Sequence, residues 1–297
     1  MKTFLTRTLT GLVFVAILVG GIIGGPHTFT LLFAAVTAAA LWEFATNINT
    51  HAGAQVNRLI NTMAGVFLFV AFAGYCADMA PSRAFIPYLI SVIYILVSEL
   101  YLRAPDPLKN WAYAFASQLY IALPLSTLCV LAFSFDRQAG QTYYNFVLPL
   151  SVFIFLWTND TGAYLFGSLL SRRFPAKLFP RISPKKSWVG SIGGGLLTLV
   201  AAALMWHYFP LSMPVRHSGL LGGLAPEVQT LIGWLGLGLI VSIFGTWGDL
   251  VESLFKRHLG IKDSGNLLPG HGGVLDRFDS SLLAIPAAVL YLYTLSL

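Results

Sequence analysis

The chain has 297 residues and a net charge of +6 at pH 7; 56% of its residues are hydrophobic and only 10% are charged. A soluble domain typically carries about 25% charged residues, so this composition excludes a water-soluble globular protein. The mean hydropathy of +0.73 is instead typical of a membrane protein.

Long apolar runs follow one another along the chain. A spanning helix needs roughly 20 mostly apolar residues, and the sequence predicts about nine such segments, near residues 9–26, 28–46, 59–80, 84–102, 111–135, 144–170, 190–209, 228–248 and 280–297. Lipid cannot satisfy free backbone groups and the alternation of barrel strands is absent, so helices are expected. The first run lacks a convincing small-residue cleavage site and is expected to be an uncleaved span. These features predict an all-α polytopic membrane protein.

The basic residues predict the orientation of these spans. With the N-terminus in the cytoplasm, the cytoplasmic segments hold every Lys and Arg residue except Arg83, Arg137 and Arg216. The positive-inside rule expects this asymmetry. Basic residues beside a membrane usually meet anionic lipid headgroups, so no nucleic-acid partner is expected.

We expect an N-terminal multi-span region over residues 1–140 and a C-terminal, catalytic membrane region over residues 141–297. The second region contains two polar segments, residues 171–189 and 249–280, which are predicted to be cytoplasmic loops. Together these two loops hold most of the basic residues of the region. A site that combines acid and base is therefore expected at the cytoplasmic surface.

The segment 270-GHGGVLDRFD-279 concentrates charge in an otherwise apolar chain. Carboxylates that gather in this way either pair with Lys and Arg or hold a hard cation such as Mg²⁺. Clustered Lys and Arg suit phosphate oxygens, and the glycines let backbone N–H groups approach an anion closely. The combination favours cation-assisted phosphate transfer over a purely structural cluster of salt bridges.

A third polar feature, Asn159-Asp160, lies inside a predicted span. Burying a carboxylate in a membrane is expensive, so it usually marks a site. Asp160 precedes the basic loop by about 10 residues, or about 15 Å along a helix. It is expected either to face a polar cavity open to the cytoplasm or to form a buried hydrogen bond between helices.

The C-terminal region resembles the signature of the phosphatidate cytidylyltransferase (CDP-diacylglycerol synthase) family. The matching residues are Ser253, Lys256-Arg257, Lys262-Asp263, Gly265, Leu268-Pro269, His271-Gly272-Gly273, Asp276-Arg277 and Asp279. Asn159-Asp160 with Ala163-Tyr164, and the segment 183–188, are also similar to family segments. The detailed resemblance covers residues 157–286. One position departs from the family pattern, because Val189 stands where Glu or Gln is usual.

The resemblance implies a reaction between CTP and phosphatidic acid that gives CDP-diacylglycerol and pyrophosphate. Mg²⁺ is the expected cofactor, as one ion or two, and an additional monovalent cation is left open. The nucleotide is cytoplasmic and the lipid lies in the bilayer, which agrees with a membrane-embedded enzyme whose site faces the cytoplasm. The expected localisation is the bacterial inner membrane, and a homodimer is left as an alternative to a monomer.

We assign the metal to Asp249 and Asp276, because folding the loop back on the eighth predicted span would bring them together. Asp160 and Asp279 are second choices as ligands or supporting partners, and Lys262 completes the catalytic candidates. The candidates for binding substrate or phosphate are Lys185, Lys186, Lys256, Arg257, His271, Gly272, Gly273, Arg277, Asn159 and Ser253. His271 is alternatively a hydrogen-bonding residue of the loop.

Other interpretations stay open at this point. A transporter of phosphorylated compounds would also explain an intramembrane Asp160 and a basic mouth, although the two related halves of many transporters are absent. Further alternatives are a CTP-using enzyme that acts on a prenol or an unusual lipid, and an inactive relative. Glu43 and Glu99, near the cytoplasmic ends of their spans, are expected to pair at helix interfaces rather than to line the cavity.

Overall fold

The computed structural model describes residues 2–136, 139–210, 213, 223–267, 270 and 272–296. The chain divides into two compact units, which are described separately here. The first unit comprises Met1–Phe146 and Phe255–Phe278, and the second comprises Val147–Leu254 and Asp279–Leu297. Residues 255–278 thus join a unit from which they are distant in sequence.

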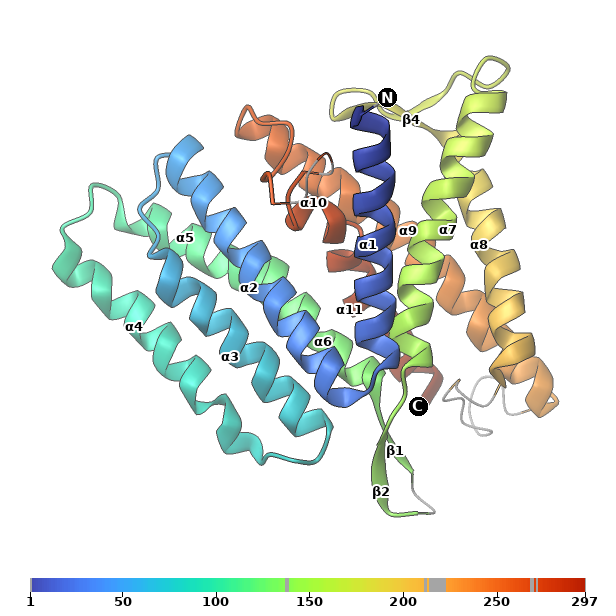
Figure 1. Ribbon diagram of the computed structural model, residues 1–297, viewed down its shortest axis with the longest axis horizontal. Helices are drawn as coiled ribbons and strands as arrows, with labels where there is room; N and C mark the ends of the chain where they lie inside the picture. The colour runs from blue at the N-terminus through green and yellow to red at the C-terminus, as the bar shows by residue number, and fades with distance from the viewer. Residues whose placement is uncertain are drawn as a thin grey trace. The chain divides into compact units, whose positions relative to one another are not determined.

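The first unit is a bundle of helices with one short hairpin (Figure 1). Its elements are α1 (Lys2–Ile23), α2 (Pro26–His51), α3 (Arg58–Cys76), η1 (Ser82–Phe85), α4 (Ile86–Leu102), α5 (Pro107–Ser117), η2 (Gln118–Ala122), α6 (Leu123–Ala132), β1 (Phe133–Asp136), β2 (Gln141–Tyr144) and α10 (Leu275–Phe278). Helices α2, α3 and α4 run side by side. The strands β1 and β2 are antiparallel, with Phe133 opposite Tyr144.

Local sequence signals set the ends of these helices. Helix α2 begins with Pro26, which suits the first helical position, and the preceding Gly25 has a φ of 114°. The Asn57 side chain caps α3 by accepting a hydrogen bond from the Ile60 N–H, and Asp106 caps α5 in the same way. These caps satisfy backbone donors that the helices leave free.

The interior of the first unit is aromatic and aliphatic. Phe29 and Phe33 of α2 are fully buried, and their ring centroids lie 5.0 Å apart. Phe278 of α10 packs edge-on against Phe33, with centroids 6.3 Å apart. A short helix of four residues has little stability of its own, so this packing is what holds α10 in the unit.

The second unit contains α7 (Val147–Leu170), β3 (Lys177–Phe179), β4 (Ser183–Ser187), α8 (Trp188–Tyr208), α9 (Pro226–His258) and α11 (Ser281–Ser296). The end of α9, residues 255–258, belongs to the first unit. Strands β3 and β4 form an antiparallel hairpin, with Lys177 opposite Ser187 and Phe179 opposite Ser183. The hairpin leads directly into α8.

Helices α7 and α8 lie side by side (Figure 1), and glycines lie at their contact. A Cβ atom on Gly162 would lie 2.9 Å from the Cα atom of Gly194, and one on Gly190 would lie 2.9 Å from the Ala163 carbonyl oxygen. Only glycine permits these contacts, as is common where membrane helices approach one another closely. The glycines therefore fix the wall of the cavity described below.

The prediction of a polytopic helical membrane protein is confirmed. Within the described residues, seven helical segments are long and apolar enough to cross a membrane: Pro26–His51, Arg58–Cys76, Ser82–Leu102, Pro107–Ala132, Trp188–Tyr208, Pro226–His258 and Leu275–Leu295. Helix α1 contributes a shorter apolar stretch, Thr8–Ile23. The predicted segment 144–170 is helical as α7, which carries Asn159 and Asp160 and is not among the seven. The two hairpins were not predicted.

Candidate active site

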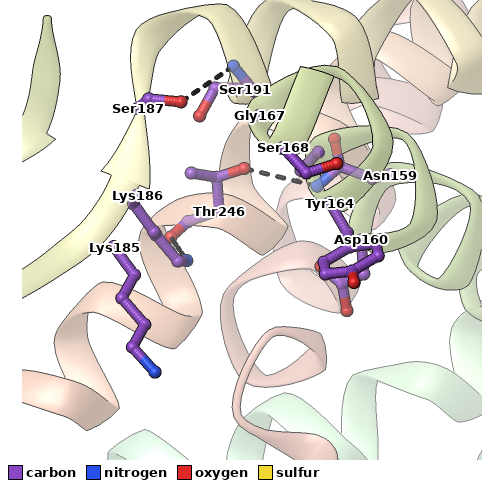
Figure 2. A pocket seen from close by; sticks show the side chains of 12 residues that line it. Asn159, Asp160, Tyr164, Gly167, Ser168, Lys185, Lys186, Ser187, Ser191 and Thr246 are labelled. Atoms are coloured by element: carbon purple, nitrogen blue, oxygen red, sulfur yellow. Dashed lines mark hydrogen bonds between the residues drawn. The ribbon is translucent and has the colours of Figure 1, made fainter. Parts of the chain in front are cut away.

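A cavity of about 390 Å³ with charged and hydroxyl side chains in its lining lies in the second unit (Figure 2). Helix α7 contributes Asn159, Asp160 and Tyr164, the hairpin strand β4 contributes Lys185 and Lys186, and α8 and α9 complete the lining. Lys185 and Lys186 lie on the hairpin side of the cavity and Asp160 on the α7 side. The cavity therefore lies between the hairpin and α7, and its lining includes Asp160, which agrees with one of the two alternatives expected for that residue.

Asp160 was expected either to face a cavity or to form a buried hydrogen bond between helices. In the structure Asp160 lines the cavity, and its neighbour Asn159 forms the buried hydrogen bonds. Asn159 is 3% exposed, and its Oδ1 accepts a hydrogen bond of 2.7 Å from the Ser242 hydroxyl of α9. Its Nδ2 donates to Thr246 Oγ1 at 3.4 Å. Asn159 therefore ties α7 to α9, and Asp160, the next residue, lies exposed in the cavity.

Lys186 and Asp249 form an ion pair between the hairpin and α9. The Lys186 Nζ lies 2.6 Å from Asp249 Oδ2 and donates to the Thr246 carbonyl oxygen at 3.4 Å. The other carboxylate oxygen of Asp249 accepts a hydrogen bond of 3.1 Å from Ser253 Oγ, one helical turn further on. The Asp249 side chain is 32% exposed. It thus remains accessible to a ligand while its partners fix its orientation.

Asp276 lies in the first unit and is bound by the chain around it. Its Oδ1 is 2.7 Å from the Lys256 Nζ, and its Oδ2 accepts two hydrogen bonds of 2.8 Å, from the Ser264 and Gly273 N–H groups. The Asp276 side chain is only 5% exposed. The Gly273 N–H, which was predicted to approach a phosphate, donates to Asp276 in this structure.

Gly272 makes this arrangement feasible. Its φ is +84°, a conformation that side-chain-bearing residues rarely adopt. A Cβ atom there would also lie 2.5 Å from Asp276 Oδ2. The glycine of the signature thus has a backbone role beside the carboxylate.

Glu43 of α2 contacts the same loop, which sequence reasoning missed. Its Oε1 accepts a hydrogen bond of 2.9 Å from the Val274 N–H, and its Oε2 accepts one of 3.0 Å from the Leu275 N–H. These donors are loop backbone groups, whereas pairing at a helix interface was expected. The available signal was a single carboxylate within the apolar run of α2, with Asn47 one turn later.

The remaining candidates are distributed as follows. Arg257, Lys262 and Arg277 are exposed in the first unit, while Asp279 is half-buried in the second. His271 lies outside the described residues. The structure therefore brings together one set of candidates in each unit: Asn159, Asp160, Lys185, Lys186, Asp249 and Ser253 in the second, and Lys256, Gly272, Gly273 and Asp276 in the first.

Val189, which departs from the family pattern, occupies the second position of α8, after Trp188. Its neighbours Ser187 and Gly190 line the cavity, and the Ser187 hydroxyl caps the helix by accepting a hydrogen bond of 3.2 Å from the Gly190 N–H. Val189 is half-buried and is not part of the described lining. Its place is thus at a helix end rather than in the cavity.

The chain matches known proteins over nearly its full length. A model described as the cytidylyltransferase family matches residues 5–295. A phosphatidate cytidylyltransferase of Haemophilus influenzae is 32% identical over 292 residues, which cover 94% of this chain and 95% of that protein. Proteins of the same name from Staphylococcus aureus (strain COL) and Staphylococcus haemolyticus are 32% identical over 284 and 283 residues, with the same coverage.

Proposed function

The chain belongs to the cytidylyltransferase family, and we infer from this that it transfers the cytidylyl group of CTP to phosphatidic acid. The products are CDP-diacylglycerol and pyrophosphate, so the enzyme is a nucleotidyltransferase of phospholipid biosynthesis. The observation that carries this inference is the family match over residues 5–295. The cavity in which the basic hairpin faces Asp160 and Thr246 within a helix bundle agrees with it. Such a cavity suits a phosphorylated substrate that comes from a bilayer.

The chemistry explains why the cavity is basic. A phosphate oxygen of phosphatidic acid attacks the α-phosphorus of CTP, the bond from that phosphorus to the bridging oxygen breaks, and pyrophosphate leaves with the bonding electrons. The attacking phosphate is already ionised, so no general base is needed. Both reactants are anions, and catalysis consists mainly of positioning and of neutralising their charge.

We propose that the hairpin supplies part of this positive charge. Lys185 is exposed in the cavity and would bind a phosphate oxygen of the nucleotide or the lipid. Lys186 is held in place by Asp249 and the Thr246 carbonyl oxygen, so little side-chain freedom is lost when it contacts a substrate. Our proposal keeps the other predicted phosphate-binding residues, which are Lys256, Arg257, Lys262, His271 and Arg277.

Mg²⁺ is the proposed cofactor, and Asp249 is suited to hold it. Mg²⁺ commonly takes one or two carboxylates and completes its shell with water and substrate phosphates. Asp249 is partly exposed, and Mg²⁺ would bind to it beside, or in exchange for, the Lys186 ammonium that lies 2.6 Å from its Oδ2. Asp276 stays a predicted ligand from the sequence, with Asp160 and Asp279 as alternatives. When bound, Mg²⁺ would neutralise phosphate charge during the transfer.

The finer topology also belongs to this proposal. We propose nine spans with the N-terminus and the site on the cytoplasmic side. This orientation places most Lys and Arg residues in cytoplasmic segments, as the positive-inside rule expects. The relatives come from bacteria, which supports a place in the bacterial inner membrane. A homodimer stays a prediction from the sequence.

Label transfer from CTP tests the proposed function. Purified protein in detergent micelles would be given phosphatidic acid and CTP labelled at either the α- or the γ-phosphorus, with and without Mg²⁺. We expect label in the lipid only from α-labelled CTP and only with Mg²⁺. Lipid label from the γ-position, or transfer to a prenol but not to phosphatidic acid, would contradict the proposal.

A further inference from the structure

Glu43 is a carboxylate of α2 whose described partners all belong to one loop. Besides the Val274 and Leu275 N–H groups, its Oε2 accepts a hydrogen bond of 3.3 Å from Ser264 Oγ. Asn47, one turn later on α2, donates from Nδ2 to the Ser264 carbonyl oxygen at 2.7 Å. One face of α2 thus binds both ends of the segment 264–275.

The loop leaves no room between itself and Glu43. A Cβ atom on Gly265 would lie 2.7 Å from Glu43 Oε1, and a Cβ atom on Gly273 would collide with Glu43 Oε2 and Ser264 Oγ. The ring of Phe44, next to Glu43, stacks on Phe255, with centroids 4.8 Å apart and an interplanar angle of 11°. Glu43 therefore sits in a close-packed and specific contact.

Glu43 and Asp276 bind neighbouring groups of the same two parts of the chain, Ser264 and residues 273–275. Ser264 donates its N–H to Asp276 and its hydroxyl to Glu43. Gly273 donates its N–H to Asp276, and the next two residues donate theirs to Glu43. The backbone that orients Asp276 is thus itself fixed by Glu43.

The hydrogen bonds of Glu43 suit a side chain with two acceptor oxygens. Each of the two oxygens accepts at least one hydrogen bond, and the described partners are all donors. A glutamine could accept only through its single oxygen, and its NH₂ group would face a backbone N–H. The isosteric change Glu43→Gln therefore breaks the contact without creating a cavity.

We propose that Glu43 is a positioning residue for the cytidylyl transfer, which holds the loop so that Asp276 and Lys256 keep their orientation. The proposal rests on the function proposed above. It assigns a role in the reaction to α2, which lies outside the segment that resembles the family signature. Glu43 itself contacts the loop backbone and Ser264, so it acts through Asp276 rather than on a substrate.

The test compares Glu43→Gln with Glu99→Gln. Glu99 of α4 is a carboxylate of the same unit that accepts hydrogen bonds from Asn110 Nδ2 at 3.0 and 3.2 Å, with no described contact to the loop. We expect Glu43→Gln to lower kcat by about tenfold, as the loss of one to two hydrogen bonds allows. Glu43→Asp should recover part of this loss, and Glu99→Gln should stay within about twofold of the wild type.

Backbone amide exchange gives a readout that does not depend on turnover. We expect faster deuterium uptake in peptides covering residues 262–278 for Glu43→Gln, and no change there for Glu99→Gln. Should Glu43→Gln fail to fold, Asn47→Ala removes one contact of the same loop and should change kcat and exchange in the same direction by less.

The outcomes separate the two proposals. A wild-type protein without transfer would overturn the proposed function, whatever the variants do. An active wild type with unchanged kcat and exchange in Glu43→Gln would overturn the positioning role alone. A lower melting temperature with normal kcat for the folded fraction would also overturn it, because Glu43 would then serve stability only.

Discussion

The two units use the same kinds of charged side chain in different ways. In the second unit, Asp160 and Lys185 are exposed in a cavity, and Asp249 is one-third exposed. In the first unit, Asp276 is 5% exposed and Glu43 is bound by backbone N–H groups. The comparison teaches that charged residues of the same type can either line a cavity or bind the backbone of the chain itself.

The largest expected effect comes from removing the carboxylate of Asp249, which pairs with Lys186 in the second unit. Asp249→Asn should lower kcat by about 100-fold or more, because a neutral amide neither pairs with Lys186 nor suits a divalent cation. Initial rates of lipid labelling at saturating CTP measure this. Asp78→Asn, an exposed acid of the first unit, is the matched control. A folded Asp249→Asn with a near-normal rate would contradict the account.

Gly272→Ala should destabilise the first unit by about 3 kcal/mol, since an unfavourable φ and a collision with Asp276 act together. Gly260→Ala is its control, because Gly260 also has a positive φ of 69° but a Cβ atom there would meet nothing within 4 Å. Thermal unfolding in detergent would compare the two. Equal losses in melting temperature would show that the loop does not pack tightly around Asp276.

A smaller effect is expected at the hairpin. Lys185→Ala should raise the KM of at least one substrate by about tenfold while leaving the melting temperature unchanged, because it removes a charge that faces the cavity. Lys177→Ala changes an exposed lysine of the same hairpin outside the described lining. Equal KM values for the two variants would contradict a role for Lys185 in binding a substrate in the cavity.

The smallest effect is expected at the position that departs from the family pattern. Val189→Glu should change kcat/KM by less than about twofold and stabilise the protein by about 0.3–1 kcal/mol, since an acidic residue near a helix N-terminus is favourable. Steady-state kinetics and thermal unfolding of the two proteins would check this. A tenfold gain in kcat/KM would mean that the side chain at position 189 serves the reaction directly.

The helices were predictable because an apolar run must be about 20 residues long to cross a bilayer, and the sequence contains several such runs. The ends shifted where local chemistry intervened: the predicted span 111–135 is Pro107–Ala132, because Asp106 caps its start and strand β1 begins at Phe133. The hairpins were not predicted. Their strands have three to five residues, which is too short for a clear alternating pattern.

The charged residues that line the cavity were predictable, but the pairings of the charged residues were not. The expense of an intramembrane carboxylate pointed to Asp160, and the basic loop pointed to Lys185 and Lys186. The partners of Asp276 and Glu43 were not predictable in the same way. Glu43 and Val274 are separated by 231 positions, and composition carries no information on which distant backbone groups a carboxylate meets.

Protection of a single cysteine tests the central claim that the cavity of the second unit binds substrate. With Cys76 and Cys129 replaced, Ser168→Cys places a thiol in the cavity lining, and Thr161→Cys places one on exposed α7 outside the described lining. CTP with Mg²⁺, or phosphatidic acid, should slow thiol labelling at position 168 and leave position 161 unchanged. Unchanged labelling at 168 with both substrates, in a variant that still turns over, would contradict the account.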